Sequence, residues 1–105
     1  MNETLSVSEE ARKVLREAGL TEYETRAYLS LLKTGALTAG EVSENANVPY
    51  SKVYETLNGL ERKGWIEAEH GRPSRYYAKS PSEALEAARL RLEDMVSGWK
   101  RIVLG

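Results

Sequence analysis

The fold of this chain is decided by residues 37–77, which read LTAGEVSENANVPYSKVYETLNGLERKGWIEAEHGRPSRYY. The stretch contains two closely spaced helix signals, followed by two short strand patterns that are joined by a turn. Two helices and a basic hairpin in this order predict a winged helix-turn-helix. The expected fold class is therefore α+β, mainly α with a small β-hairpin.

The first helix of the pair has two independent start signals. Thr38 is a good N-cap and Glu41 completes a capping box, while Leu37 and Val42 can form a hydrophobic staple. This helix must be short, because residues 45–49 (NANVP) form a turn sequence.

The second helix is expected over residues 49–63, with Pro49 near its first position. Its apolar face is expected to comprise Val53, Leu57 and Leu60, with Tyr54 extending it on one side and Thr56 on the opposite, polar surface. Near the start of the helix this polar surface presents four side chains: Tyr50, Ser51, Lys52 and Glu55. Short polar groups at a helix N-terminus can reach base edges in a major groove of about 12 Å width. On this segment alone, a solvated helix face without a specific role is an equally good interpretation.

The expected wing spans residues 65–79, where two alternating segments flank the turn Gly71-Arg72-Pro73-Ser74. The turn would project Arg72, and with it Arg75, toward a phosphate backbone or a minor groove, because the planar guanidinium matches phosphate geometry. The alternative is that both arginines pair with Glu67 and Glu69 across the hairpin, where such pairs contribute little stability.

Two helices are expected upstream of this stretch. The first ends near Ala18, and the second begins after a capping box from Thr21 to Glu24 and ends at Gly35. The second helix is expected to bury an aromatic and aliphatic stripe: Tyr23, Ala27, Tyr28, Leu31 and Leu32.

Downstream, Ser80 and Pro81 mark the start of a long helix that continues to about Val103. Apolar residues recur along it at alternating spacings of three and four: Leu85, Ala88, Leu92, Met95, Trp99 and Ile102. This seam either packs on its own domain or pairs with the same helix of a second chain. Since the preceding helices already account for a small core, dimerisation is favoured. Residues 1–79 are thus expected to form the DNA-binding domain and residues 80–105 a dimerisation element.

Composition limits the possible functions. The chain has 105 residues, a net charge of −1, no cysteine and one histidine, His70. A disulfide framework, a metal site and a cofactor are not expected, and no nucleophile–base pair or phosphate loop indicates an enzyme. The sequence shows neither a long apolar run nor a secretory signal, so we expect a cytoplasmic protein without a membrane partner.

Several motifs resemble those of the TrmB-like archaeal transcriptional regulators. They are residues 20–28 (LTEYETRAY), 49–57 (PYSKVYETL), 60–64 (LERKG) and 75–77 (RYY). The resemblance covers roughly residues 15–88. It implies a DNA-binding regulator, usually with a dimerising helix after the wing. Many members carry a further C-terminal domain for an effector, which is often a sugar. This sequence departs from that pattern, so the resemblance does not imply a sugar ligand for it.

The sequence thus predicts a homodimeric regulator that binds double-stranded DNA, with Thr38 near phosphates in addition to the helix and wing residues named above. A protein-interaction module in a transcription-related complex is the alternative, because winged helices also serve as docking domains.

Overall fold

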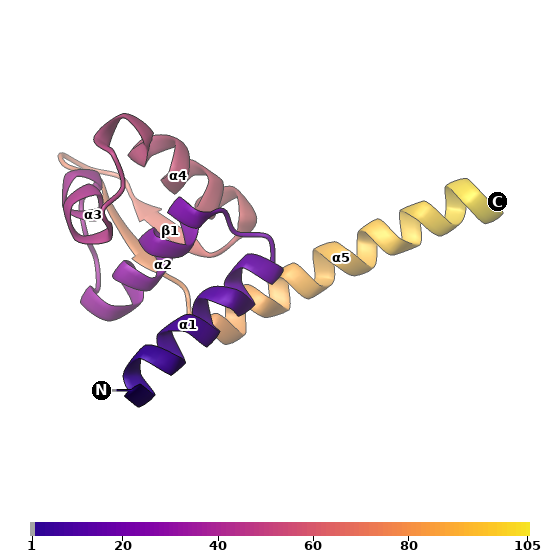
Figure 1. Cartoon of the computed structure of the whole chain (residues 1–105). Helices are drawn as coiled ribbons and strands as arrows, with labels where there is room; N and C mark the ends of the chain where they lie inside the picture. Colours follow the sequence, from indigo (N-terminus) through magenta and orange to yellow (C-terminus); the bar gives the residue numbers. More distant parts are fainter. Residues whose placement is uncertain (1) are drawn as a thin grey trace.

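The computed structural model describes residues 2–105, with side-chain burial for residues 9–87 and 89–105. It confirms the predicted class, since five helices accompany one two-stranded antiparallel sheet (Figure 1). The elements are α1 (Asn2–Glu17), α2 (Glu22–Thr34), α3 (Ala39–Ala46), α4 (Tyr50–Lys63), β1 (Ile66–Glu69), β2 (Arg75–Ala78) and α5 (Pro81–Leu104).

The helix starts follow local hydrogen-bonding chemistry. Thr21 and Thr38 both form complete capping boxes, with Glu24 and Glu41 respectively as the returning carboxylates. Pro49 differs from the prediction, because it is the N-cap of α4 and not its first residue. Its backbone is extended (φ −54°, ψ 137°), so the helical conformation begins at Tyr50.

The core lies between α2, α3, α4 and the hairpin. The rings of Tyr28 and Trp65 meet edge to face, with 5.1 Å between their centroids. The Tyr28 hydroxyl donates a hydrogen bond of 2.9 Å to the Lys79 carbonyl, which ties α2 to the end of β2. A backbone bridge between Leu37 and Tyr76 extends the hairpin on its other side. The wing is therefore anchored along β2, to α2 and to the segment that precedes α3.

The buried face of α2 differs in part from the predicted stripe. Ala27, Tyr28 and Leu31 are buried as expected, whereas Leu32 is exposed and Tyr23 is partly buried. Thr25 and Glu24 are buried in addition. In the described part of the chain α2 contacts α3, α4 and β2 more extensively than α1, and its buried face is turned toward those elements.

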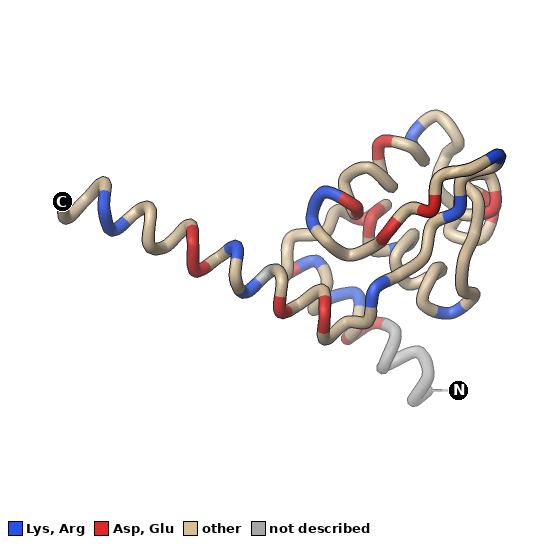
Figure 2. The backbone as a smooth tube through the Cα atoms, turned by 180° about the vertical axis from the view of Figure 1, so that it is seen from behind, with Lys and Arg blue, Asp and Glu red and all other residues tan. Residues whose placement is uncertain are grey.

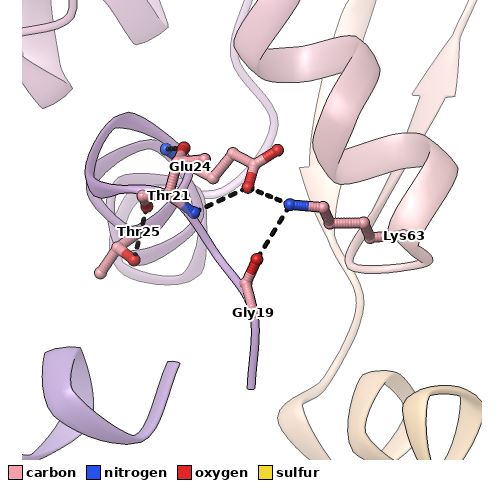
Figure 3. A network of polar contacts seen from close by, with 5 residues as sticks. All are labelled: Gly19, Thr21, Glu24, Thr25 and Lys63. Carbon is pink, nitrogen blue, oxygen red and sulfur yellow. Dashed lines mark hydrogen bonds and ion pairs between the residues drawn. The ribbon is translucent and has the colours of Figure 1, made fainter. Parts of the chain in front are cut away.

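A polar network joins the start of α2 to the end of α4 (Figure 3). The buried Glu24 carboxylate accepts hydrogen bonds from the Thr21 backbone N–H (2.8 Å) and from Lys63 Nζ (2.6 Å). Lys63 Nζ also donates to the Gly19 carbonyl at 3.0 Å. Helix α4 carries the predicted base-reading residues near its N-terminus. Its C-terminal end is held by the hydrogen-bonded ion pair between Lys63 and Glu24.

Helix α5 extends away from the rest of the molecule and carries the C-terminus at its far end (Figures 1 and 2). Ala84, in its first turn, is buried, whereas the seam residues Leu92, Met95, Trp99 and Ile102 are exposed. The side chain of Ala88, also assigned to the seam, lies outside the described residues. Among the described residues, no helix combines the length and the apolar character needed to span a bilayer.

Candidate nucleic-acid interface

The first turns of α4 present the residues that the sequence assigned to DNA. Tyr50, Ser51, Lys52 and Glu55 are all exposed. Lys52 Nζ lies 3.8 Å from a Glu55 carboxylate oxygen, so these two side chains form an exposed pair along the helix. Val53, on the opposite side, is fully buried and holds this face outward.

Two neighbours on α4 were assigned wrongly from the sequence. Tyr54, expected to extend the apolar face, is 51% exposed and meets the Tyr50 ring edge to face at 6.0 Å. Thr56, expected on the polar surface, is buried, and its hydroxyl donates to the Lys52 carbonyl at 2.8 Å. The spacing of four between Tyr50 and Tyr54 was the available signal, because such residues share one helix face.

The wing presents Arg72 in its turn and Arg75 at the start of β2, and both side chains are exposed. The predicted alternative, in which these arginines pair with carboxylates across the hairpin, is not observed in the described part of the chain. Glu67 Oε1 instead lies 3.8 Å from Lys79 Nζ, and the Glu67 carboxylate accepts a hydrogen bond of 2.7 Å from the Tyr77 hydroxyl. The wing arginines are therefore available for an external anion.

The start of α3 lies beside the wing. Thr38 is half-buried, and its hydroxyl accepts the Glu41 backbone N–H at 3.2 Å. Hydrogen bonds with Thr38 hold the pKa of Glu41 below its usual value, with a smaller contribution from the positive charge of Arg75. The Glu41 carboxylate thus stays ionised, and it accepts a hydrogen bond from the Thr38 backbone N–H.

A groove of about 480 Å³ brings the three segments together. It is lined by the start of α3 (Thr38, Ala39, Gly40), the tyrosines of α4 (Tyr50, Tyr54), the wing turn (Gly71, Arg72, Pro73, Ser74) and Tyr76 of β2. Of the predicted DNA-binding residues, Thr38, Tyr50 and Arg72 meet in this groove, whereas Ser51, Lys52, Glu55 and Arg75 lie outside its lining. Tyr54 and Ser74 belong to it and were not assigned from the sequence.

Charge along the chain is mixed, as Figure 2 shows, with lysines and arginines interspersed among carboxylates. Residues 49–80, which contain α4 and the wing, carry six basic and four acidic groups, whereas residues 1–48 carry five and eight. The local excess of positive charge thus falls on the candidate interface. Among the described residues, no cluster of His, Cys, Asp or Glu could hold a metal ion.

A family model described as "Sugar-specific transcriptional regulator TrmB" matches residues 15–82. The HTH-type sugar sensing transcriptional regulator TrmBL1 of Pyrococcus furiosus is 38% identical over 96 residues, which cover 91% of this chain and 27% of that protein. The DNA-binding HTH-type transcriptional repressor TrmBL2 of Thermococcus kodakarensis is 36% identical over 67 residues, 64% of this chain and 25% of that protein. The chain thus spans about a quarter of the length of these relatives.

Solved structures show the same fold. TrmBL2, described as an archaeal chromatin protein with a novel mode of DNA binding, superposes with a TM-score of 0.77 at 28% identity, covering 90% of this chain and 40% of that one. A MarR-family transcriptional regulator from Silicibacter pomeroyi superposes with a TM-score of 0.59 at 25% identity, covering 93% of this chain and 67% of that one.

Proposed function

Because the chain belongs to the TrmB family of transcriptional regulators, we propose that it binds double-stranded DNA sequence-specifically as a homodimeric regulator. One observation carries the proposal. The groove joins Thr38, Tyr50 and Arg72, which come from three separate segments and were each expected to contact DNA. Residues 1–79 form the DNA-binding unit in this proposal, and residues 80–105 the dimerisation element.

Helix α4 enters the major groove with its N-terminal turns. Ser51, Lys52 and Glu55 are exposed there, and their hydroxyl, ammonium and carboxylate groups suit the donors and acceptors of base edges. In the free protein Lys52 and Glu55 face each other at 3.8 Å. Such an exposed pair is weak, so it can separate at little cost when base edges compete for it.

The wing arginines contact the phosphate backbone or the neighbouring minor groove. Arg72 and Arg75 are exposed, and the carboxylate of Glu67 in the hairpin is engaged by Lys79 and Tyr77. Thr38 caps the start of α3 and lies near the phosphates of the DNA backbone.

Dimerisation uses the seam of α5. Trp99 and Ile102 are 67% and 81% exposed, and Leu85, Leu92 and Met95 are also exposed. Ala88 completes the heptad spacing of this seam. Pairing of two α5 helices would remove these apolar groups from water. A two-fold dimer sets two copies of α4 about 34 Å apart, one turn of duplex DNA, on a pseudo-palindromic site.

Salt dependence of DNA binding tests the wing assignment. The variant Arg72→Ala/Arg75→Ala should bind duplex DNA more weakly and lower the slope of log K against log salt by about one unit for each lost phosphate contact. The matched control Arg12→Ala/Lys13→Ala removes two exposed cations of α1 and should keep the wild-type slope. Wild-type binding with no slope change in the wing variant would contradict the assignment.

Base reading is tested separately, by selection from a random duplex pool. Ser51→Ala or Lys52→Ala should alter the selected sequence as well as the affinity, because base contacts and not phosphate contacts carry sequence information. If both variants select the wild-type sequence, these two residues do not read bases. If the wild type binds no duplex even at low salt, a protein-docking role replaces DNA binding.

A further inference from the structure

We propose that the groove between α4 and the wing holds one sugar-phosphate strand of the duplex, and that the hydroxyls of Tyr50 and Tyr54 donate hydrogen bonds to its phosphates. The inference rests on the proposed function and deepens it. It gives Tyr54 a role in binding, and it assigns Tyr50 to the backbone and not to base edges.

The two tyrosines form one exposed unit. Tyr50 is 60% exposed and Tyr54 is 51% exposed, and their rings meet at an interplanar angle of 86°. At this exposure the polar ends of the two rings can reach a ligand. A tyrosine hydroxyl is protonated at neutral pH and can donate a hydrogen bond.

The position of the groove follows from duplex geometry. If α4 lies in the major groove and the wing turn reaches the adjacent minor groove, the strand that separates these two grooves must pass between α4 and the wing. The groove lined by Tyr50, Tyr54, Arg72 and Ser74 occupies this place in the protein. A sugar-phosphate strand is therefore the part of the duplex that reaches these side chains.

The lining also has the chemistry of a phosphodiester site. Arg72 supplies one positive charge, and Thr38, Tyr50, Tyr54 and Ser74 carry hydroxyl groups. Among the described residues that line the groove, none carries a carboxylate. A phosphodiester has one negative charge and acceptor oxygens alone, so a single cation with neutral donors complements it.

Helical periodicity separates this backbone face from the base-reading face. Residues in an α-helix follow one another at 3.6 per turn, which places Tyr50 and Tyr54 close together and turns Ser51 and Glu55 by about 100° from them. Ser51, Lys52 and Glu55 accordingly lie outside the groove lining. Helix α4 thus directs one face to the backbone and an adjacent face to the bases.

The test is a phenylalanine substitution that removes only the hydroxyls. Tyr50→Phe/Tyr54→Phe and the control Tyr77→Phe are compared with the wild-type chain. Tyr77 is also on the surface, and its hydroxyl donates to Glu67 outside the groove. The probes are a duplex selected from a random pool and an unrelated duplex of equal length, with binding followed by fluorescence anisotropy at several salt concentrations.

The double variant should bind both duplexes at least about tenfold more weakly, because two hydroxyl contacts to charged phosphates are lost. The salt slope should stay unchanged, since a neutral donor releases no counterion, in contrast with Arg72→Ala. Tyr77→Phe should bind as the wild type does. A methylphosphonate at a contacted phosphate should weaken the wild type more than the double variant, because both keep Arg72 and the wild type alone also loses its tyrosine contacts.

Two outcomes would overturn the inference and leave the proposed function intact. One is wild-type affinity of the double variant for both duplexes. The other is a loss confined to the selected duplex and reproduced by replacing single thymines with deoxyuridine, which would make the tyrosine rings base contacts. Failure of the wild type to bind either duplex would instead remove the proposed function.

Discussion

Glu24 holds two helices in place, although its sequence context indicated only one role. It completes the capping box at the start of α2, and its buried carboxylate also binds Lys63 at the end of α4. The partners are separated by 39 residues in the chain, so the local capping motif could not predict the second contact. Gly59 makes the approach possible, because a Cβ there would collide with the Glu24 carboxylate.

Replacing Gly59 with alanine should therefore destabilise the domain. Alanine in a helix interior normally stabilises by roughly 0.5–1 kcal/mol relative to glycine. Here the new Cβ would collide with the Glu24 carboxylate, which Thr21 and Lys63 hold in place. The substitution should therefore lower the unfolding free energy by about 1 kcal/mol or more instead of raising it. Gly40→Ala is the control, since a Cβ at Gly40 meets nothing within 4 Å. Urea unfolding should separate the two variants in opposite directions; equal stabilisation by both would refute the packing argument.

Tyr28 should make the stability of the domain sensitive to alkaline pH. Burial raises the pKa of Tyr28 from 10.0 to about 12. Because the folded pKa lies above the unfolded value, this contribution is complete below pH 10 and is lost as the pH rises toward 12. Tyr28→Phe should cost about 1 kcal/mol at pH 7, because the Lys79 carbonyl loses its donor. The variant should then lose less stability than the wild type between pH 10 and 12 in urea unfolding. Parallel losses would show that Tyr28 is not responsible.

At the scale of the elements, the sequence predicted the starts of α2 and α3 and the ends of α2 and α4 well, because their causes are local. Both threonine caps, Gly35 and Gly64 after their helices, and the two wing strands lie where they were expected. The buried faces of the helices were predicted less well, because burial depends on which other elements a helix packs against. Tyr54 sits beside the apolar stripe of α4, yet the described structure leaves it exposed in the groove.

The candidate interface was likewise predicted in part. The residues at the start of α4 and the wing arginines could be assigned from motif and charge, and they are exposed as such a role requires. The groove that joins Tyr50 to Arg72 could not be assigned, because it depends on the approach of the wing turn to α3 and α4. The family resemblance drawn from the same motifs is confirmed by the family model and by the relatives.

The capping box of α3 is testable at this scale. Thr38→Ala should lower the unfolding free energy by about 1 kcal/mol, whereas Thr38→Ser should retain most of it, because serine supplies the same acceptor. The pKa of Glu41 is lowered from 4.5, so the stability linked to its ionised form is present above pH 4.5 and lost as the pH falls below it. Thermal unfolding at pH 7 and pH 3 should show a smaller difference between Thr38→Ala and the wild type at the lower pH. An equal difference at both values would argue against the box.

For the whole molecule, the exposed apolar seam of α5 is the proposed contact between two chains. The wild-type chain should be a dimer at micromolar concentration, and Leu92→Asp should dissociate it, because a carboxylate in a coiled-coil seam is costly to bury. Lys100→Asp is the matched control, an identical new side chain at an exposed position of α5 outside the seam. Sedimentation equilibrium measures both. A wild-type monomer, or dissociation by both variants alike, would defeat the assignment of the seam.

We propose above all that α4 and the wing bind duplex DNA, and that pairing of two α5 helices places two copies of them on one site. A hydroxyl-radical footprint of the wild-type protein on a pool-selected duplex tests it most directly. We expect two protected patches whose centres lie about 10 base pairs apart, each covering a backbone strand beside a contacted major groove. Absence of protection by the folded protein at low salt would contradict DNA binding, and a single protected patch would contradict the paired arrangement.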